Sequence, residues 1–142
     1  MKYLFLDVDG VLNTSSSWNI RYQLNKKLVS NLAMIVKKTD AKLVLSSTWR
    51  YGWDNDAPSP QITKLKEYLK EAGIYIEDIT PVLQGRSRDT EINRYLYFHP
   101  CDKYIVVDDD RREFKDTKNV YFVNPETGLL KKDAKTIAKL LK

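Results

Sequence analysis

The chain has 142 residues, of which 42% are hydrophobic and 30% charged; these proportions fit one globular domain and exclude a disordered or fibrous protein. It carries 24 Lys and Arg against 19 Asp and Glu, and the net charge of +5 favours an anionic partner such as nucleic acid or a nucleotide. A surplus of this size also occurs on proteins that bind no anion, so the charge alone does not identify the partner.

Cysteine usage and the N-terminal segment indicate a cellular location. Cys101 is the single cysteine and His99 the single histidine, which excludes an internal disulfide and leaves no cysteine cluster for zinc. We therefore expect a reducing cytoplasm and no disulfide partner. The first apolar run is interrupted by Asp7, too early for a signal peptide, and no stretch approaches membrane length, so we expect no membrane partner.

The first half of the chain alternates short apolar runs with amphipathic segments. The run Lys2–Leu6 ends abruptly in acidic residues and predicts a buried parallel strand. Apolar residues at helical spacing predict a helix over Asn25–Thr39. A second strand is expected at Lys42–Leu45 and an exposed polar loop at Tyr51–Pro58. A second helix is expected over residues 60–72, with Ser59 at its start and Gly73 at its end.

The second half continues the alternation. Ile79–Leu83 has the composition of a short strand, although Pro81 weakens that prediction. Asp89 is expected to cap the next helix, which carries apolar residues at helical spacing. Two further strands are expected at Tyr104–Val107 and Val120–Val123. A turn is expected at Asn124–Gly128 and a final helix at Asp133–Leu141.

Strands that alternate with helices predict a single Rossmann-like α/β domain over residues 1–142, with a parallel sheet covered by helices on both faces. In such sheets, ligands bind at the carboxyl ends of the strands, near the point where the strand order reverses. Three of the expected strands end in carboxylates or hydroxyls. The sequence therefore predicts a functional site at that edge.

Asp7 and Asp9 follow the first strand two residues apart. In continued strand geometry both side chains share one face, and Gly10 permits the chain to turn. Two carboxylates so placed divide a reaction between them, one attacking and one moving protons. The alternative is an ordinary acidic turn, because Asp-Gly is a common turn pair.

Three acidic residues, Asp108, Asp109 and Asp110, end a later apolar run. Adjacent like charges repel one another, so a native site needs a cation to hold them together, and oxygen ligands of this kind suit Mg²⁺. The alternative is a solvated acidic loop at the end of a strand.

Hydroxyl and guanidinium groups stand at the remaining positions. Ser46 and Ser47 are candidates to donate hydrogen bonds to a phosphoryl oxygen, although serine after a strand is usually a turn former. Arg86 and Arg88 precede the third helix and are candidates to neutralise phosphate charge, with surface arginine as the alternative. Independent turns would rarely place acids, hydroxyls, a base and acids again in this order.

The motifs DVDGV, LVLSST, an arginine before a helix, and YIVVDDD resemble the four motifs of the haloacid dehalogenase (HAD) superfamily, from Tyr3 to about Asp110. More narrowly, DVDGVLN with LSSTWR, VVDDD and a late Thr-Gly-Leu-Leu is similar to small HAD domains of phage and bacterial proteins, some associated with RNA repair. The resemblance implies a HAD-type phosphatase, a hydrolase of phosphoric monoesters, that uses Mg²⁺.

Residue by residue, the resemblance implies that Asp7 is the nucleophile and forms an aspartyl-phosphate intermediate. It implies that Asp9 protonates the leaving oxygen and later deprotonates the water. It also implies that Mg²⁺ is held by the Asp7 carboxylate, the Asp9 carbonyl and the Asp109 carboxylate, with Asp108 close by or substituting.

For the phosphate group, the resemblance favours the hydroxyl of Ser46, with Ser47 as the second choice. The family usually has lysine in its third motif, whereas this chain offers only Arg86 or Arg88 before the helix. We prefer Arg88 on that placement.

Larger relatives of this kind carry an inserted cap domain, but Gly10–Ala41 and Thr48–Arg86 leave room for little more than a flap and a helix each. We expect a capless protein, or one with a minimal cap, whose open site admits the end of a polymer. Trp49 and Arg50 follow the serines and are candidate substrate contacts, as is Trp18 in the flap region. Packing in the core is the alternative for such aromatic residues.

The leading functional hypothesis is a phosphomonoesterase of a nucleic-acid end or nucleotide, with a terminal 3′-phosphate on single-stranded RNA or DNA as the first choice. The alternative is a phosphatase of a small metabolite or phosphoprotein, which shares every catalytic residue. A minor alternative is a non-catalytic phosphate-binding module, which requires one of the two key acids to be idle.

Overall fold

The computed structural model describes residues 1–53 and 58–142, so part of the loop expected over Tyr51–Pro58 lies outside the described residues. The strands are β1 (Lys2–Leu6), β2 (Lys42–Leu45), β3 (Ile76–Ile79), β4 (Lys103–Asp108) and β5 (Val120–Phe122). The α-helices are α1 (Lys26–Thr39), α2 (Pro60–Glu71), α3 (Arg88–Phe98) and α4 (Lys131–Leu141). Short 3-10 helices η1, η2 and η3 lie at Ser15–Ser17, Thr48–Arg50 and Arg111–Glu113.

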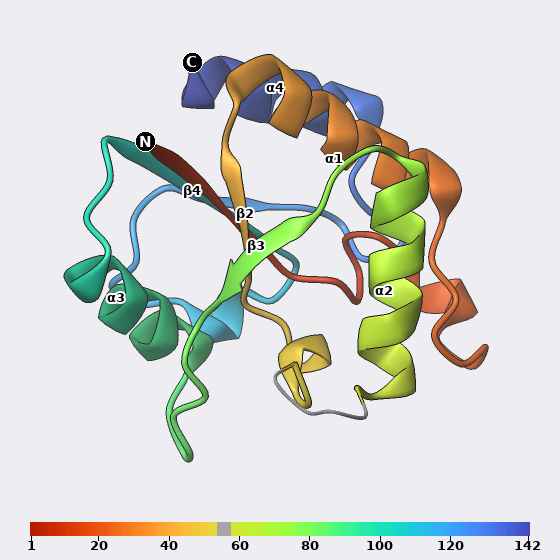
Figure 1. The fold of residues 1–142 in the computed structure, drawn as a ribbon, viewed down its shortest axis with the longest axis horizontal. Coiled ribbons are helices and arrows are strands. Elements are labelled where there is room, and N and C mark those ends of the chain that lie inside the picture. The colour runs from red at the N-terminus through yellow and green to blue at the C-terminus, as the bar shows by residue number, and fades with distance from the viewer. Residues whose placement is uncertain (54–57) are drawn as a thin grey trace.

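The five strands form one parallel sheet in the order β3-β2-β1-β4-β5 (Figure 1). The central strand β1 pairs on one side with β2, where Leu6 lies opposite Leu45, and on the other with β4, where Leu6 lies opposite Val107. Strands β2 and β3 extend the sheet in one direction from β1, and β4 and β5 extend it in the other. The order therefore reverses between β1 and β4, which is where such sheets bind ligands.

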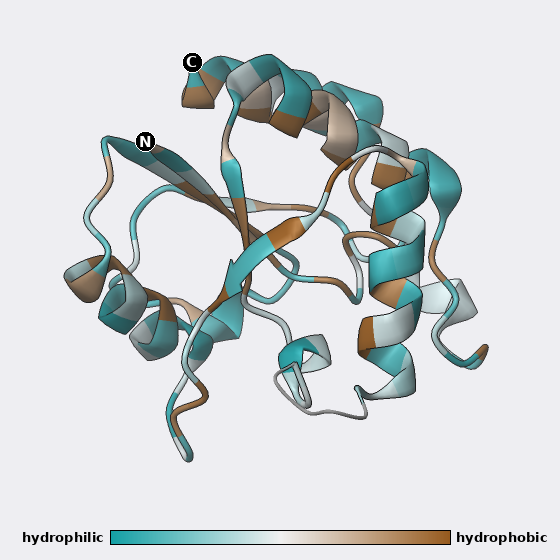
Figure 2. Ribbon diagram, viewed as in Figure 1, coloured by the Kyte–Doolittle hydropathy of each residue, from teal (hydrophilic) through white to brown (hydrophobic). Residues whose placement is uncertain are grey.

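The two faces of the sheet are covered unequally. Leu4 and Leu6 of β1 point into the larger core, which α1, α2 and α4 close, whereas Tyr3 and Phe5 point into a smaller core under α3. Figure 2 shows hydrophobic residues along the strands and both hydrophobic and hydrophilic patches on the helices, as amphipathic helices on a buried sheet require. This arrangement is the Rossmann-like α/β fold that the sequence predicted.

Helix starts follow local capping chemistry. Asn25 accepts hydrogen bonds from two backbone N–H groups at the start of α1, and Ser59 accepts one at the start of α2. The expected cap of α3 was wrong: Ser87, not Asp89, accepts the backbone N–H of Thr90. Asp89 lies in the first turn, where its carboxylate accepts backbone N–H groups from residues 115–117.

The third strand also differs from the prediction. It spans Ile76–Ile79 rather than Ile79–Leu83, and Thr80 makes the last backbone hydrogen bond to β2, from its N–H to the carbonyl of Leu45 at 3.0 Å. The next residue is Pro81, which has no N–H to continue the ladder. The last helix begins at Lys131, two residues before the expected start.

No inserted domain covers the carboxyl edge of the sheet within the described residues. Between β1 and α1 the chain forms a flap (residues 14–24) with the short helix η1, and between β2 and β3 it forms η2 and α2. The edge that carries the polar residues is therefore open.

Among the described residues, no helix has both the length and the apolar composition that crossing a bilayer requires.

Candidate active site

The ends of three strands and the start of one helix surround a pocket of about 480 Å³ at the point where the strand order reverses. Its chemically active lining comes from the segments after β1, β2 and β4 and from the start of α3, with one side chain from the flap. These residues are Asp7, Asp9, Trp18, Ser47, Arg88 and Asp109. The structure therefore brings together most of the site residues that the sequence singled out.

Asp7 faces Arg88 across the pocket floor. Nη1 of Arg88 lies 3.2 Å from Oδ1 of Asp7 and donates to Oδ2 of Asp108 at 2.7 Å. Tyr3 and Phe5 of β1 face α3, and Asp7 continues that alternation, so its carboxylate reaches the first residue of this helix. A helix start and a guanidinium at the same point favour an anionic ligand.

Burial and mutual repulsion shift the ionisation of these groups. Burial raises the pKa of Asp7 well above its ordinary value, and the charge of Asp108 raises it further, although Arg88 opposes the rise. Burial also raises the pKa of Asp109. Burial works against the charge of Arg88, but Asp7 and Asp108 outweigh it and raise the pKa, so the guanidinium stays charged. The site carries more negative charge than one arginine balances.

The carboxylates have the arrangement that a divalent cation requires. Oxygen atoms of Asp7, Asp108 and Asp109 lie within 4.8 Å of one another, and such hard oxygen ligands suit Mg²⁺. When all three are ionised, three negative charges and the single positive charge of Arg88 leave a net charge of two minus, which one Mg²⁺ neutralises.

Asp108 and Asp109 have different surroundings. Asp108 is fully buried, and its Oδ1 accepts the backbone N–H groups of Asp109 and Asp110 at 2.7 and 3.0 Å while Arg88 holds its Oδ2. Asp109 is half-buried and lines the pocket together with Asp7. The geometry thus favours Asp7 and Asp109 as metal ligands and gives Asp108 the role of holding Arg88.

Gly10 makes room for the Asp109 carboxylate. Its φ of +81° lies in the left-handed region, and a Cβ atom at this position would collide with that carboxylate and lie 3.1 Å from Pro125 Cβ. Only glycine permits the chain to turn here while Asp109 approaches Asp7. The Asp-Gly pair is thus more than a turn, because it keeps space for the acidic cluster.

The carboxylate of Asp9 is held on both oxygens. Asn13 donates to Oδ1 at 2.9 Å, and the indole N–H of Trp49 donates to Oδ2 at 3.1 Å. Asn13 in turn accepts the indole N–H of Trp18 at 2.9 Å and the backbone N–H of Gly10 at 2.8 Å. Asn13 was not predicted as a site residue, because it returns to Asp9 through an irregular turn at Gly10, whose φ is +81°, and no sequence periodicity indicates such a turn.

The two serines after β2 have different roles. Ser46 is fully buried, and its hydroxyl donates to the backbone carbonyl of Leu6 at 3.2 Å, so the first choice for the phosphate-binding hydroxyl is corrected. Ser47 lines the pocket, and its oxygen accepts the backbone N–H of Trp49 at 3.1 Å. No described residue accepts a hydrogen bond from the Ser47 hydroxyl, so this hydroxyl is available to donate to a phosphoryl oxygen.

The structure also corrects the expectation that Trp49 and Arg50 contact substrate, because these side chains are only 3% and 2% exposed. Trp49 contacts the site through its indole N–H, which donates to the Asp9 carboxylate. Arg50 pairs with Glu91 at 2.8 Å and donates to the backbone carbonyls of Ser46 and Ser47 at 2.9 and 2.8 Å. This arginine therefore fixes the loop that follows β2.

Arg86 lies outside the pocket that holds Asp7 and Arg88, which is named the phosphate pocket below after the ligand expected there. It lines an adjoining hollow of about 460 Å³ together with Tyr51, whereas Arg88 lines both spaces. Glu113 is also common to both and accepts the backbone N–H of Arg88 at 3.1 Å. Of the two arginines proposed for the third motif, the geometry favours Arg88.

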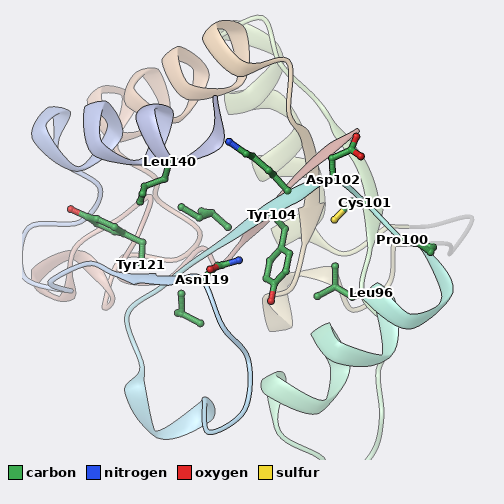
Figure 3. Close-up of a pocket in the computed structure, with 11 residues that line it drawn as sticks. Leu96, Pro100, Cys101, Asp102, Tyr104, Asn119, Tyr121 and Leu140 are labelled. Atoms are coloured by element: carbon green, nitrogen blue, oxygen red, sulfur yellow. The ribbon is translucent and has the colours of Figure 1, made fainter.

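A further hollow of about 520 Å³ lies at the opposite end of the sheet, between α3, α4 and the beginnings of β4 and β5 (Figure 3). Its lining is largely apolar, with Tyr104, Tyr121 and Leu140 among the side chains drawn. Asp102 on its rim binds the N-terminal ammonium group. It lacks the paired acids of the pocket at the carboxyl edge, so we assign the chemistry to that pocket.

Comparison with known proteins agrees with this geometry. A search of curated proteins found no match to the chain. Residues 3–134 match the family model described as the HAD domain in Swiss Army Knife RNA repair proteins. This match covers β1 from Tyr3 onward, the other four strands in full, and every residue of the pocket at the carboxyl edge. The chain therefore belongs to the family of HAD domains found in Swiss Army Knife RNA repair proteins.

Proposed function

We propose that the protein is a Mg²⁺-dependent phosphomonoesterase in which Asp7 forms an aspartyl-phosphate intermediate. The observation that carries the proposal is the convergence of Asp7, Arg88, Asp109 and Ser47 on one open pocket, with Asp9 at its side. Each group a phosphoryl transfer needs is present there: a nucleophile, a proton carrier, cationic and hydroxyl donors, and carboxylates for a metal.

In the first step, a carboxylate oxygen of Asp7 attacks phosphorus, and the bond between phosphorus and the leaving oxygen breaks. Asp9 gives its proton to that oxygen, which departs as an alcohol. Arg88 and Ser47 hold the phosphoryl oxygens during the transfer. When bound by Asp7, Asp109 and the Asp9 carbonyl, Mg²⁺ supplies the positive charge that offsets repulsion between the carboxylate and the phosphate.

In the second step, Asp9 takes a proton from water, and the resulting hydroxide attacks the phosphorus of the aspartyl phosphate. The bond between phosphorus and Asp7 breaks, inorganic phosphate leaves, and Asp9 is protonated for the next cycle. Asn13 and Trp49 orient the Asp9 carboxylate for both transfers, since each donates to one of its oxygens.

The substrate class that fits best is the terminal phosphate of a nucleic acid, with a 3′-phosphate on a single strand as the first choice. The uncovered pocket, the net charge of +5 and membership of a family named for RNA repair support it.

We place the protein in the reducing cytoplasm, because its one cysteine, Cys101, forms no disulfide.

The test is a phosphate-release assay with Mg²⁺ on an aryl phosphate, mononucleotides, and oligonucleotides phosphorylated at the 3′ or the 5′ end. We expect release from the 3′-phosphorylated oligonucleotide and none with Asp7→Asn or with EDTA. Release from the aryl phosphate or the mononucleotides but from neither oligonucleotide would replace the substrate class and leave the mechanism. Undiminished release by Asp7→Asn, or none by the native protein, would contradict the mechanism.

A further inference from the structure

A second, smaller hollow opens from the phosphate pocket on the side of Asp9. It has a volume of about 260 Å³ and is lined by Asp9, Asn13, Trp18 and Ile20. Asp9 and Trp18 also line the phosphate pocket, so the two spaces share a wall. Polar groups at the inner end and two exposed apolar side chains, Trp18 at 50% and Ile20 at 53%, give this hollow a mixed lining.

The indole ring of Trp18 is fixed relative to the catalytic acid. Its N–H donates to Oδ1 of Asn13 at 2.9 Å, and Nδ2 of Asn13 donates to Oδ1 of Asp9, also at 2.9 Å. The polar end of the ring is thus satisfied inside the protein while half of the side chain remains open to solvent. A large flat ring held in this way is a stacking surface whose ordering cost has already been met by the fold.

The proposed reaction decides which hollow takes the leaving group. The leaving oxygen lies opposite the attacking Asp7, and Asp9 must reach it to deliver a proton. The rest of the leaving group therefore lies on the Asp9 side. The adjoining hollow beyond Arg88 is lined by neither Asp7 nor Asp9 among the described residues, so it does not meet this requirement.

We propose that the hollow lined by Asn13, Trp18 and Ile20 binds the terminal nucleoside of the substrate, with its base stacked on Trp18. This inference rests on the proposed phosphatase function and names the part of the substrate that the open site recognises. A nucleoside suits the lining because its base offers a π-face to the indole, and the amide N–H of Asn13 that is not bound to Asp9 can donate to a sugar hydroxyl. A stacked base of any identity satisfies Trp18, so we expect little sequence preference.

The first test compares two substrates, adenosine 3′-phosphate and glycerol phosphate, of which only the first carries a ring. In Trp18→Leu, kcat/KM for adenosine 3′-phosphate should fall about 5- to 140-fold further than for glycerol phosphate. This range is the ~1–3 kcal/mol of one stacked base converted at 1.4 kcal/mol per tenfold change. Trp18→Phe keeps a ring and should restore most of the difference.

Tyr51→Leu is the matched control, because Tyr51 is also 50% exposed but lines the hollow beyond Arg88. It should leave the ratio between the two substrates unchanged within experimental error. An equal loss on both substrates in Trp18→Leu would overturn the proposal and leave Trp18 only a positioning role through Asn13. A larger effect of Tyr51→Leu would move the nucleoside to the other hollow.

A binding measurement separates this proposal from the phosphatase mechanism. Asp7→Asn protein with adenosine 3′-phosphate should show quenching of tryptophan fluorescence that is lost when Trp18→Phe is added. If the native protein releases no phosphate but this quenching persists, the mechanism fails and the nucleoside site stands. If the quenching is the same with and without Trp18, the nucleoside site fails even where phosphate is released.

Discussion

At the residue scale, we expect the acidic cluster to make the protein's stability depend on both pH and metal. Burial raises the pKa values of Asp7 and Asp109, so these side chains bind protons more tightly in the folded than in the unfolded chain. Their stabilising contribution is present at and below the unfolded pKa of about 4 and is lost as pH rises towards the folded values. Because Mg²⁺ requires ionised carboxylates, we expect its binding to offset that loss.

We therefore expect the increase in Tm caused by Mg²⁺ to be larger at pH 7.5 than at pH 5, because fewer protons then compete for the carboxylates. Free Mg²⁺ at 100 times its Kd adds ~2.7 kcal/mol of stability, or roughly 5–10 °C in Tm for a chain of this size. Differential scanning calorimetry with and without Mg²⁺ at each pH measures the effect.

Asp109→Asn provides the control for this prediction. It removes a repelling charge, so the metal-free variant should melt at or above the native Tm, and it should lose most of the response to Mg²⁺. A Mg²⁺ response of the same size in the variant would show that Asp109 is not a ligand. A response independent of pH would show that the ionisation of these carboxylates is not linked to metal binding.

Arg88 is predicted to be the cation that the reaction depends on. Removing a charged donor from a preorganised site lowers kcat by about 10²–10³-fold, so Arg88→Met should show a loss of this order in phosphate release. Arg88→Lys keeps the positive charge but lacks the planar guanidinium, so its activity should lie between that of the native protein and that of Arg88→Met. The matched control is Arg86→Met, which should retain most of the activity because Arg86 lies outside the pocket. A loss in Arg86→Met as large as that in Arg88→Met would contradict the assignment of this role to Arg88.

Single-residue choices within the site were the least accessible from sequence. Ser46 and Ser47 are chemically identical, and what separates them is the residue at which the chain leaves β2 and turns into η2. That bend turns Ser46 towards Leu6 and Ser47 towards the pocket. Local propensity carries no information on such a bend, because it depends on Arg50 being anchored from another element.

At the element scale, the ion pair between Arg50 of η2 and Glu91 of α3 joins the two segments that flank the phosphate pocket. Both side chains are at least 90% buried, and the 2.8 Å contact is supported by bonds to the carbonyls of Ser46 and Ser47 and to the N–H of Leu83. Removal of one member of such a pair leaves an uncompensated charge in the interior.

We predict that Arg50→Met or Glu91→Met lowers the free energy of unfolding by ~3–5 kcal/mol. Urea denaturation measures the loss. The double variant Arg50→Met, Glu91→Met buries no charge and should recover part of it, which a double-mutant cycle quantifies. Additive losses, with no recovery in the double variant, would mean that the pair is not coupled as its geometry indicates.

The elements themselves were largely predictable because each has a strong local signal. The apolar runs before Asp7 and Asp108 gave β1 and β4, and the Ser59-Pro60 pair gave the start of α2. The errors fell where two signals compete. Ser87 and Asp89 both suit a helix start, and tertiary bonds to residues 115–117 engage Asp89 elsewhere.

At the scale of the whole molecule, fold and charge act together on the choice of substrate. The parallel sheet brings the acids to one edge, and no inserted domain covers that edge among the described residues. Arg86 lines the adjoining hollow and Arg112, which pairs with Asp110, lines the pocket, and we expect these cationic side chains to attract phosphates beyond the terminal one. Substrate recognition by such a surface depends on long-range attraction as well as on contacts inside the pocket.

The salt dependence of binding should report how far the strand extends over the surface. For single strands, log K falls with log salt with a slope of about −0.7 for each phosphate neutralised, so contact with three phosphates gives a slope of about −2. We expect Asp7→Asn protein to show a slope of about this size with a 3′-phosphorylated oligonucleotide. A mononucleotide should show a much shallower slope, because it offers one phosphate and carries no condensed counterion layer to release. Fluorescence anisotropy of a labelled oligonucleotide at several salt concentrations, with the mononucleotide as competitor, gives both slopes. If the two slopes are equal, only the terminal phosphate is held, and the net charge of +5 plays no part in choosing a polymer over a small metabolite.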